Sequence, residues 1–343
     1  MNLTAPAPLT TQLLSTESKG DVELAAALLR AGRLVAMPTE TVYGLAANAL
    51  DPAAVHGIFE AKKRPGWDPL IVHVSDETML ARIVREISPT ARRLMEAFWP
   101  GPLTLLLPRG AEVPDAVTAG RDLVGVRMPA HPAALALIRA AGLPLAAPSA
   151  NLFGHISPTT ADHVLADLRG RIHAVLDAGP CAIGVESTVL DPNAMVLYRQ
   201  GGVSAADVER VAGQLVNIYQ PPAVEHSAPE SLPSPGVGIR HYAPRARLLL
   251  VLSEEDMRSV LAAADAAATG AMLPTGWLPE WRGKTFGWGN WTNPAELART
   301  LYQGLRSLDD GAIETIVCPL PASSGETLVE ALRDRLQKAA RAA

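Results

Sequence analysis

Cysteine is scarce in this sequence: 343 residues contain two, Cys181 and Cys318, far apart and outside any CxxC or Cys/His pattern. This usage excludes a disulfide-stapled secreted domain and a cysteine-based zinc site, and it is typical of buried thiols in a reducing cytoplasm. An apolar run of transmembrane length is absent, and the first residues lack the basic segment and apolar core of a signal peptide. We therefore expect a cytoplasmic protein without a membrane partner.

Excess positive charge is also missing, because 30 Lys and Arg stand against 35 Asp and Glu, a net charge of −5. Aromatic residues make up 4% of the chain, so neither a basic field nor a stacking surface predicts strong RNA binding. No Walker A sequence, GxGxxG fingerprint or GxSxG elbow occurs, and neither cysteine stands beside a histidine. These absences favour catalysis by positioning and charge neutralisation, as in nucleotidyl transfer.

What the sequence does contain is a regular alternation of short apolar runs and amphipathic segments, which is typical of an α/β fold. Up to residue 220 the alternation predicts one large domain with a substantial sheet. Residues 221–246 are rich in proline and lack periodicity, which indicates an extended linker. The alternation resumes in residues 247–343 and predicts a smaller, doubly wound α/β domain. The predicted domains are therefore 1–220 and 247–343, joined by 221–246.

The first polar cluster is PTETVYGL, where Thr39, Thr41 and Tyr43 follow the strand-like run RLVAMP at once. A strand end that only faces solvent needs no such group of hydrogen-bonding side chains. Ligands of α/β sheets commonly bind beyond the ends of strands. We therefore interpret this cluster as one side of a binding site.

A second cluster, KKRPGWDPL, places Lys62 and Arg64 at the end of a predicted helix. Cations at this position are often a solvated cap that the helix dipole favours. Two prolines and a glycine restrict the loop, however, so it also fits a phosphate site with an arginine fork and a lysine charge. His73, in the strand that follows, is either a core histidine bonded to backbone or a ligand-binding residue.

Two further clusters complete the set of polar strand ends. PLAAPSANLFGHISP brings Ser149, Asn151 and Ser157 between a strand and a helix. Ser157 or Thr159 fits a helix N-cap, and hydroxyls with exposed backbone amides at a helix start also make an anion site. GVESTV and YRQGG add Ser187 and Arg199. Each cluster alone is a weak signal, but together they indicate one site for small polar and anionic groups.

The ordered series PTETVYGL, KKRPGWDPLIVHV, WPGPLTLLLP, GVRMP, PSAN, GVESTV, YRQGG and SPG to HYAP closely resembles the YrdC-like threonylcarbamoyl-AMP synthases in their long two-domain form. The first seven motifs span residues 34–203, and the linker signature SPGVGIRHYAP spans 234–244. Residues 248–343 resemble the family in position and pattern. The resemblance implies a YrdC-like twisted mixed-sheet domain followed by a smaller Rossmann-like α/β domain.

The implied activity is that of a nucleotidyltransferase, which condenses L-threonine, bicarbonate or CO2, and ATP to threonylcarbamoyl-AMP and pyrophosphate. Mg2+ would accompany ATP, and its protein ligands are left unassigned. The adenylate is the first intermediate of N6-threonylcarbamoyladenosine formation in tRNA. The implied partner is therefore a downstream tRNA threonylcarbamoyl transferase complex, and a weak contact of the chain itself with tRNA stays open.

The family pattern also implies roles for individual side chains. Those implied for L-threonine are Thr39, Thr41, Tyr43, His73, Arg127 and Ser187. Those implied for ATP are Lys62, Arg64, Asp68, Ser149, Asn151, Ser157, Arg199 and Tyr242. Lys62 and Arg64 would act catalytically on the phosphates, and Arg127 would form a bidentate ion pair with the amino acid carboxylate. Tyr242 would fold back over the site, which would make the proline-rich stretch a lid.

Two positions depart from the family pattern. Asp68 stands where asparagine is usual, which puts a negative charge near the phosphates unless it helps to hold magnesium. Gln200 stands where proline usually follows the arginine. Two other functions stay open: another carbamoyl-adenylate-forming enzyme, for which the chain has neither the length nor the cysteines, and an RNA-binding maturation factor, against which the net charge counts.

Overall fold

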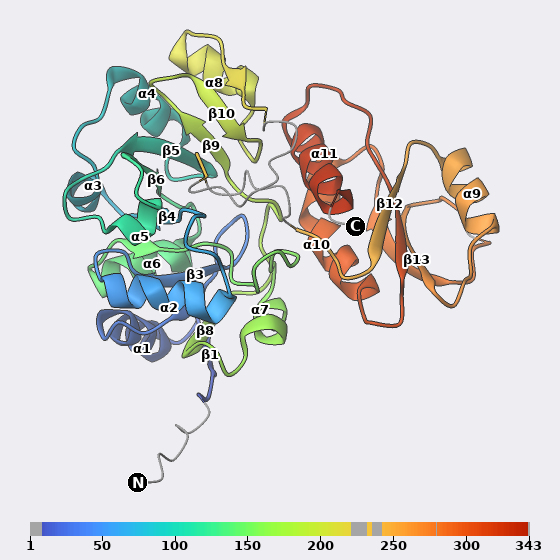
Figure 1. Cartoon of the computed structure of the whole chain (residues 1–343), viewed down its shortest axis with the longest axis horizontal. Coiled ribbons are helices and arrows are strands. Elements are labelled where there is room, and N and C mark those ends of the chain that lie inside the picture. The colour runs from blue at the N-terminus through green and yellow to red at the C-terminus, as the bar shows by residue number, and fades with distance from the viewer. Residues whose placement is uncertain (1–8, 221–231, 235–241, 279, 342–343) are drawn as a thin grey trace.

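The computed structural model describes residues 9–220, 232–234, 242–278 and 280–341, which form two α/β domains (Figure 1). Within these residues the strands make one sheet of eleven strands and a second sheet of four. This architecture confirms the predicted fold class, a larger mixed-sheet domain followed by a smaller α/β domain. Most of the predicted linker 221–246 lies outside the described residues, so its boundaries stay a prediction.

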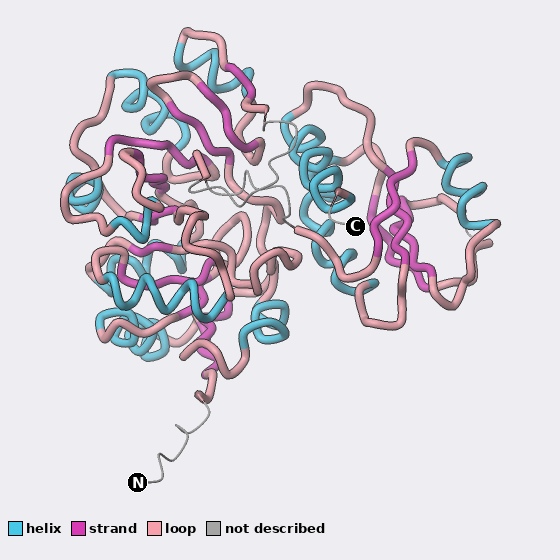
Figure 2. The backbone as a smooth tube through the Cα atoms, viewed as in Figure 1, coloured by secondary structure: helices cyan, strands magenta, loops and turns pink. Residues whose placement is uncertain are grey.

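The N-terminal sheet mixes parallel and antiparallel neighbours in the order β1-β8-β2-β3-β7-β4-β6-β5-β9-β10-β11. Figure 2 shows the strands of the structure in magenta and the helices in cyan. Its central strands are buried on both faces, which explains their continuous apolar sequences. The strands are β1 (Gln12–Ser15), β2 (Val35–Met37), β3 (Gly44–Asn48), β4 (Ile71–His73), β5 (Leu103–Pro108), β6 (Leu123–Arg127), β7 (Leu145–Ala146), β8 (Ala174–Asp177), β9 (Thr188–Asp191), β10 (Val196–Arg199) and β11 (Asn217–Ile218).

The helices of this domain begin at polar caps that the sequence displays. Ser18, Asp51 and Ser88 each accept a hydrogen bond from a backbone amide in the first turn, and α2 and α4 start with proline. The helices are α1 (Lys19–Arg30), α2 (Pro52–Lys62), α3 (Glu77–Ile83), α4 (Pro89–Phe98), α5 (Asp115–Thr118), α6 (Pro132–Ala141), α7 (Ala161–Leu168) and α8 (Ala205–Ala212).

The C-terminal domain has a parallel sheet in the order β12-β15-β13-β14. Its elements are β12 (Arg247–Val251), α9 (Glu254–Ala262), β13 (Thr269–Pro274), β14 (Lys284–Gly289), α10 (Pro294–Leu308), β15 (Thr315–Pro319) and α11 (Thr327–Ala340). Figure 1 shows α10 and α11 on the side of this sheet that faces the N-terminal domain, with α9 on the far side. Side chains of α10 and α11 can therefore reach the larger domain.

Several elements were not foreseen in the sequence. Strand β3 consists of GLAAN, and its small side chains give no β-branched or aromatic signal. Other unpredicted elements have eight residues or fewer, which is too short for a clear periodic pattern. They are strands β1, β8 and β11 and helices α3, α5 and α8. Among the described residues, no helix is both long and apolar enough to cross a bilayer.

Candidate active site

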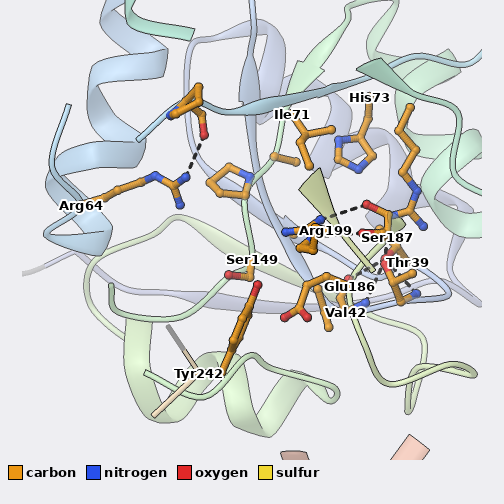
Figure 3. A pocket seen from close by; sticks show the side chains of 16 residues that line it. Thr39, Val42, Arg64, Ile71, His73, Ser149, Glu186, Ser187, Arg199 and Tyr242 are labelled. Atoms are coloured by element: carbon orange, nitrogen blue, oxygen red, sulfur yellow. Dashed lines mark hydrogen bonds between the residues drawn. The ribbon is translucent and has the colours of Figure 1, made fainter. Parts of the chain in front are cut away.

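One cavity opens at the strand ends of the N-terminal sheet, with about 590 Å³ of empty space including its mouth. Figure 3 shows its wall, in which side chains from several loops converge. Apolar groups such as Ile71 and Val42 lie among the polar side chains. The polar side chains are Thr39, Thr41, Arg64, His73, Arg127, Ser149, Glu186, Ser187, Arg199 and Tyr242. Three arginines in one small cavity suit a ligand with carboxylate and phosphate groups.

Thr39 shapes the loop that follows β2. Its Oγ1 accepts hydrogen bonds from the backbone amides of Thr41 and Val42, both at 3.2 Å, and lies 2.6 Å from the Val42 carbonyl oxygen. Such a side-chain turn replaces strand pairing where the chain bends. The Thr39 hydroxyl therefore holds the turn, and it leaves Thr41 Oγ1, 2.8 Å away, to meet the arginine on β6.

Arg127 ends β6 and lies beside His73 on the neighbouring parallel strand. Its Nε donates to the Gly101 carbonyl at 3.0 Å, its Nη1 donates to Thr41 Oγ1 at 2.9 Å, and its Nη2 is 2.5 Å from a carboxylate oxygen of Glu40. Burial and the Arg127 charge lower the pKa of His73 to about 3, so its ring is neutral at pH 7. His73 Nδ1 has no hydrogen-bond partner within the described structure.

Arg64 supplies a second cation from the loop after α2 (Figure 3). Its guanidinium donates to the carbonyls of Asp68 and Pro69 at 3.2 and 2.8 Å, and it forms an ion pair with the Asp68 carboxylate at 2.9 Å. Asp68 is fully buried behind the wall. The unusual carboxylate at this position is thus paired with Arg64.

Lys62 lies behind the wall and fastens the loop that follows β7. Its Nζ donates to the backbone carbonyls of Ser149 at 2.5 Å and Asn151 at 2.6 Å, and the side chain is buried. Burial lowers the pKa of Lys62 well below its ordinary value. The Asn151 amide is engaged as well, since it donates to the carbonyls of Leu152 and His155, each at 2.8 Å. The Lys62 hydrogen bond holds the Ser149 backbone in place at the cavity.

Ser187 and Arg199 form a further part of the wall. Arg199 Nε donates to the Ser187 carbonyl at 2.9 Å and Nη2 donates to Ser187 Oγ at 3.1 Å, while Thr104 Oγ1 lies 2.8 Å from the same hydroxyl. A Cβ at Gly201 would come within 2.4 Å of the Ser187 carbonyl carbon, so glycine is needed there. These contacts fix the direction of Arg199 even though Gln200 replaces the usual proline.

Glu186 connects the cavity to the C-terminal domain. Its carboxylate accepts hydrogen bonds from Ser157 Oγ at 2.5 Å and from the Tyr302 hydroxyl of α10 at 2.9 Å, and it pairs with Arg335 of α11 at 2.7 Å. Burial alone would raise the pKa of Glu186. The charges of Arg335 and Arg199 outweigh burial and hold that pKa below its ordinary value. The carboxylate is therefore charged at neutral pH.

Tyr242 closes the cavity on the side of the C-terminal domain, and in Figure 3 its side chain points toward Ser149. Its ring stacks with Tyr302 at 6.0 Å between centroids, and the Arg335 guanidinium lies 5.1 Å from the ring centre. The predicted lid includes residues 235–241, which lie outside the described residues. The position of Tyr242 itself follows from its contacts with α10 and α11.

The structure divides the predicted site residues into two groups. Those that line the cavity are Thr39, Thr41, Arg64, His73, Arg127, Ser149, Ser187, Arg199 and Tyr242. Those that lie behind its wall within the described structure are Tyr43, Lys62, Asp68, Asn151 and Ser157. Tyr43, for instance, donates its hydroxyl hydrogen bond to the Gly179 carbonyl at 2.7 Å. Ligand contacts by this second group stay predictions, because these side chains do not line the cavity.

Sequence reasoning missed Glu40 and the residues that meet at Glu186 from the C-terminal domain. A signal for Arg335 was present, because it lies on the apolar stripe of α11 with Leu332 and Leu336. An arginine in such a stripe needs a buried acid as partner. The sequence could not identify that acid, since Glu186 precedes it by 149 residues.

Family models match nearly the whole chain. One, described as telomere recombination, covers residues 27–201, and one described as threonylcarbamoyl-AMP synthase, C-terminal domain, covers residues 203–341. The curated threonylcarbamoyl-AMP synthase of Pyrococcus abyssi is 41% identical over 327 residues, which cover 93% of each chain. The chain belongs to the threonylcarbamoyl-AMP synthase family. The synthase of Bacillus subtilis is also 41% identical, over 96% of this chain and 95% of its own.

The architecture of this threonylcarbamoyl-AMP synthase family member agrees with a solved relative. A crystal structure of P. abyssi Sua5 complexed with L-threonine matches it with a TM-score of 0.87 and 38% identity, over 97% of this chain and 98% of that one. The match confirms the family and the two-domain fold that the motifs predicted. It includes the C-terminal domain, where the sequence signal was weaker.

Proposed function

We propose that this chain condenses L-threonine, bicarbonate or CO2, and ATP to threonylcarbamoyl-AMP and pyrophosphate. The observation that carries the proposal is the convergence of Arg64, Arg127 and Arg199 with the hydroxyls of Thr41 and Ser187 in one cavity of a family member. The substrates include an amino acid carboxylate and a triphosphate, and both are anions that arginine binds well.

The threonine end of the cavity is the part around Arg127. Its guanidinium is available to a carboxylate, while the hydroxyl of Thr41 and the neutral ring of His73 suit the amine and hydroxyl of the substrate. Because its pKa lies near 3, His73 is a weak base and would not take a proton from an ammonium group. We assign His73 a hydrogen-bonding role, and we propose that the ammonium group of threonine gives its proton to solvent before the carbamate forms.

The nucleotide end is the part around Arg64. Arg64 and Arg199 would meet the phosphates, and Ser149 with Tyr242 would lie along the AMP moiety. The chemistry then needs little from the protein: an oxygen of N-carboxy-threonine attacks the α-phosphorus, and the bond from that phosphorus to the bridging oxygen breaks to release pyrophosphate. The arginines neutralise charge on the leaving group, and apolar groups of the wall such as Ile71 and Val42 would help to keep water from the carbamate.

Magnesium is expected to enter with ATP. Among the described residues, no group of three or more His, Cys, Asp and Glu could hold a metal ion by itself. This fits Mg2+, which keeps several waters and is commonly held by substrate phosphates with few protein ligands. When bound, it would neutralise charge on the β- and γ-phosphates.

We further propose that the adenylate passes to a tRNA threonylcarbamoyl transferase complex in the cytoplasm, and that any tRNA contact of this chain is weak. The net charge of −5 supports the last point, because tight phosphate-backbone binding needs clustered cations.

The test is release of pyrophosphate from ATP, with L-threonine and bicarbonate each omitted in turn. We expect release only with all three present, and a product with the mass of threonylcarbamoyl-AMP. Retention of tRNA without threonine-dependent release would contradict the proposal and favour an RNA-binding factor.

A further inference from the structure

Glu40 is a buried carboxylate that the proposed reaction does not yet use. It stands between the two threonines of the loop after β2, and its side chain is 10% exposed. Glu40 is not among the described residues that line the cavity. Its carboxylate lies 2.5 Å from Arg127 Nη2, so it contacts the cavity arginine from behind.

The Glu40 carboxylate is charged in the folded protein. Burial alone would raise the pKa of Glu40, but the charge of Arg127 and a hydrogen bond to it outweigh burial and lower that pKa. A buried ion pair of this kind contributes little to stability compared with apolar side chains of similar volume. Stability is therefore a poor explanation for a charged pair at this place.

The contacts of Arg127 show what the pair achieves. A guanidinium has five N–H donors, and here Nε donates to the Gly101 carbonyl and Nη1 to Thr41 Oγ1, while Nη2 lies 2.5 Å from Glu40 as an ion pair without hydrogen-bond geometry. At least one N–H on each terminal nitrogen is left. Two such N–H groups are the fork that binds a carboxylate through two parallel hydrogen bonds.

The loop that carries Glu40 is itself held in place. The backbone carbonyl of Glu40 accepts a hydrogen bond from the Ile183 amide at 2.8 Å, and the Thr41 carbonyl accepts one from the Gly184 amide at 3.2 Å. The carboxylate thus approaches Arg127 from a fixed backbone, and its position is set before any substrate binds.

We propose that Glu40 is a positioning residue for threonine binding: it fixes the Arg127 guanidinium so that its two remaining N–H groups face the substrate carboxylate. This inference rests on the proposed function, in which Arg127 binds L-threonine. The inference requires that the carboxylate oxygens of Glu40 hold Arg127 in place. The negative charge of Glu40 cannot attract the substrate carboxylate, because the two groups repel each other.

The first experiment compares Glu40→Leu with Glu40→Gln by calorimetric titration of L-threonine and by the Michaelis constants for threonine and ATP. Leucine removes the acceptor, and we expect at least tenfold weaker threonine binding with the ATP constant within about twofold. Glutamine keeps an acceptor oxygen, so we expect most of the affinity to return. Glu112→Leu, which breaks an exposed pair with Arg82, is the matched control and should change neither constant.

A second experiment covers the case in which Glu40→Leu leaves Arg127 unpaired and fails to fold. Arg127→Ala creates space for free guanidinium, and millimolar guanidinium should restore threonine binding to that variant. The double variant Arg127→Ala/Glu40→Leu contains no buried charge from this pair, so it should fold. Guanidinium should not restore threonine binding to it, because Glu40 is no longer there to position the guanidinium.

Wild-type affinity in Glu40→Leu, equal losses for threonine and ATP, or equal rescue in the single and double variants would each overturn the inference. An equal loss of threonine affinity in Glu40→Gln and Glu40→Leu would also overturn it. That result would show that the negative charge of residue 40 matters and that an acceptor oxygen alone is not enough. If the wild-type protein binds no threonine, the proposed function fails, and the inference falls with it.

Discussion

The Asp68 carboxylate lies 2.9 Å from the Arg64 guanidinium, and it is fully buried behind the wall of the cavity. Arg64 is also held by the backbone carbonyls of Asp68 and Pro69. Two kinds of contact therefore fix the direction of Arg64. The ion pair depends on the charge of the Asp68 carboxylate, and the hydrogen bonds to the backbone carbonyls do not. The ion pair with Arg64 gives the negative charge of Asp68 a partner next to the predicted phosphate site.

Asp68→Asn should separate these two causes. The carbonyls still hold Arg64, but its charge is no longer compensated, so we expect the Michaelis constant for ATP to fall about fivefold, or ~1 kcal/mol. Loss of the buried pair should lower the free energy of unfolding by about 1–3 kcal/mol. Steady-state kinetics and urea unfolding measure both. A rise in the ATP constant would show that the carboxylate, and not the backbone, directs Arg64.

Arg64→Ala should remove the phosphate contact itself. A lost charge-assisted hydrogen bond costs roughly 1.5–3 kcal/mol, which corresponds to about 10- to 150-fold in turnover at limiting ATP. Lys63→Gln is the matched control, because Lys63 adjoins Arg64 but is exposed. Unchanged kinetics of Arg64→Ala at limiting ATP would remove Arg64 from the nucleotide site.

Arg127→Lys should act on the other substrate. Lysine keeps the charge but has no planar fork, so we expect the Michaelis constant for threonine to rise about tenfold or more while the constant for ATP changes little. The measurement is pyrophosphate release with one substrate varied at a time. Equal effects on both constants would indicate general damage to the fold.

Arg335→Met should make stability depend on pH in a new way. The lowered pKa of Glu186 means that its pairing stabilises the fold above about pH 4.3, and that this contribution is lost as pH falls through the folded-state pKa. Without Arg335, burial raises that pKa, and a charged carboxylate is left short of a partner at pH 7. We expect a loss of about 3–5 kcal/mol at pH 7 that shrinks as the pH falls and Glu186 takes up a proton.

Urea unfolding at several pH values measures this difference. Arg333→Met on the same helix is the matched control, since Arg333 is part-exposed and its pair with Glu330 is 3.9 Å long. We expect the control to lose less than about 1 kcal/mol. A loss in Arg335→Met that stays constant with pH would mean that Glu186 is not the group affected.

The sequence predicted those helices and strands whose signals lie within their own segment. Helix α10 has a strong apolar stripe, an Asn293 cap and a proline start, and all three signals lie within its own segment of the sequence. The small side chains of β3 carry no such signal, and its pairing with distant strands decides its structure.

The site divides in the same way. Motif resemblance found residues such as Arg127 and Ser187, because the family keeps them in short ordered segments. It could not separate side chains that line the cavity from those, such as Lys62, that turn to a backbone carbonyl. It also could not find Tyr302 and Arg335, since long-range contacts between buried polar groups depend on how two finished domains meet.

The pairing of Glu186 with Arg335 has a consequence for synthesis on the ribosome. The arginine follows the glutamate by 149 residues, which take about 7–30 s to translate at 5–20 residues per second. During that time the N-terminal domain can fold, yet the carboxylate at its cavity lacks Arg335 throughout and lacks Tyr302 until 116 residues have been added. The nascent domain must keep Glu186 hydrated or protonated until α11 arrives, so this wall of the cavity is completed in one of the last steps of folding.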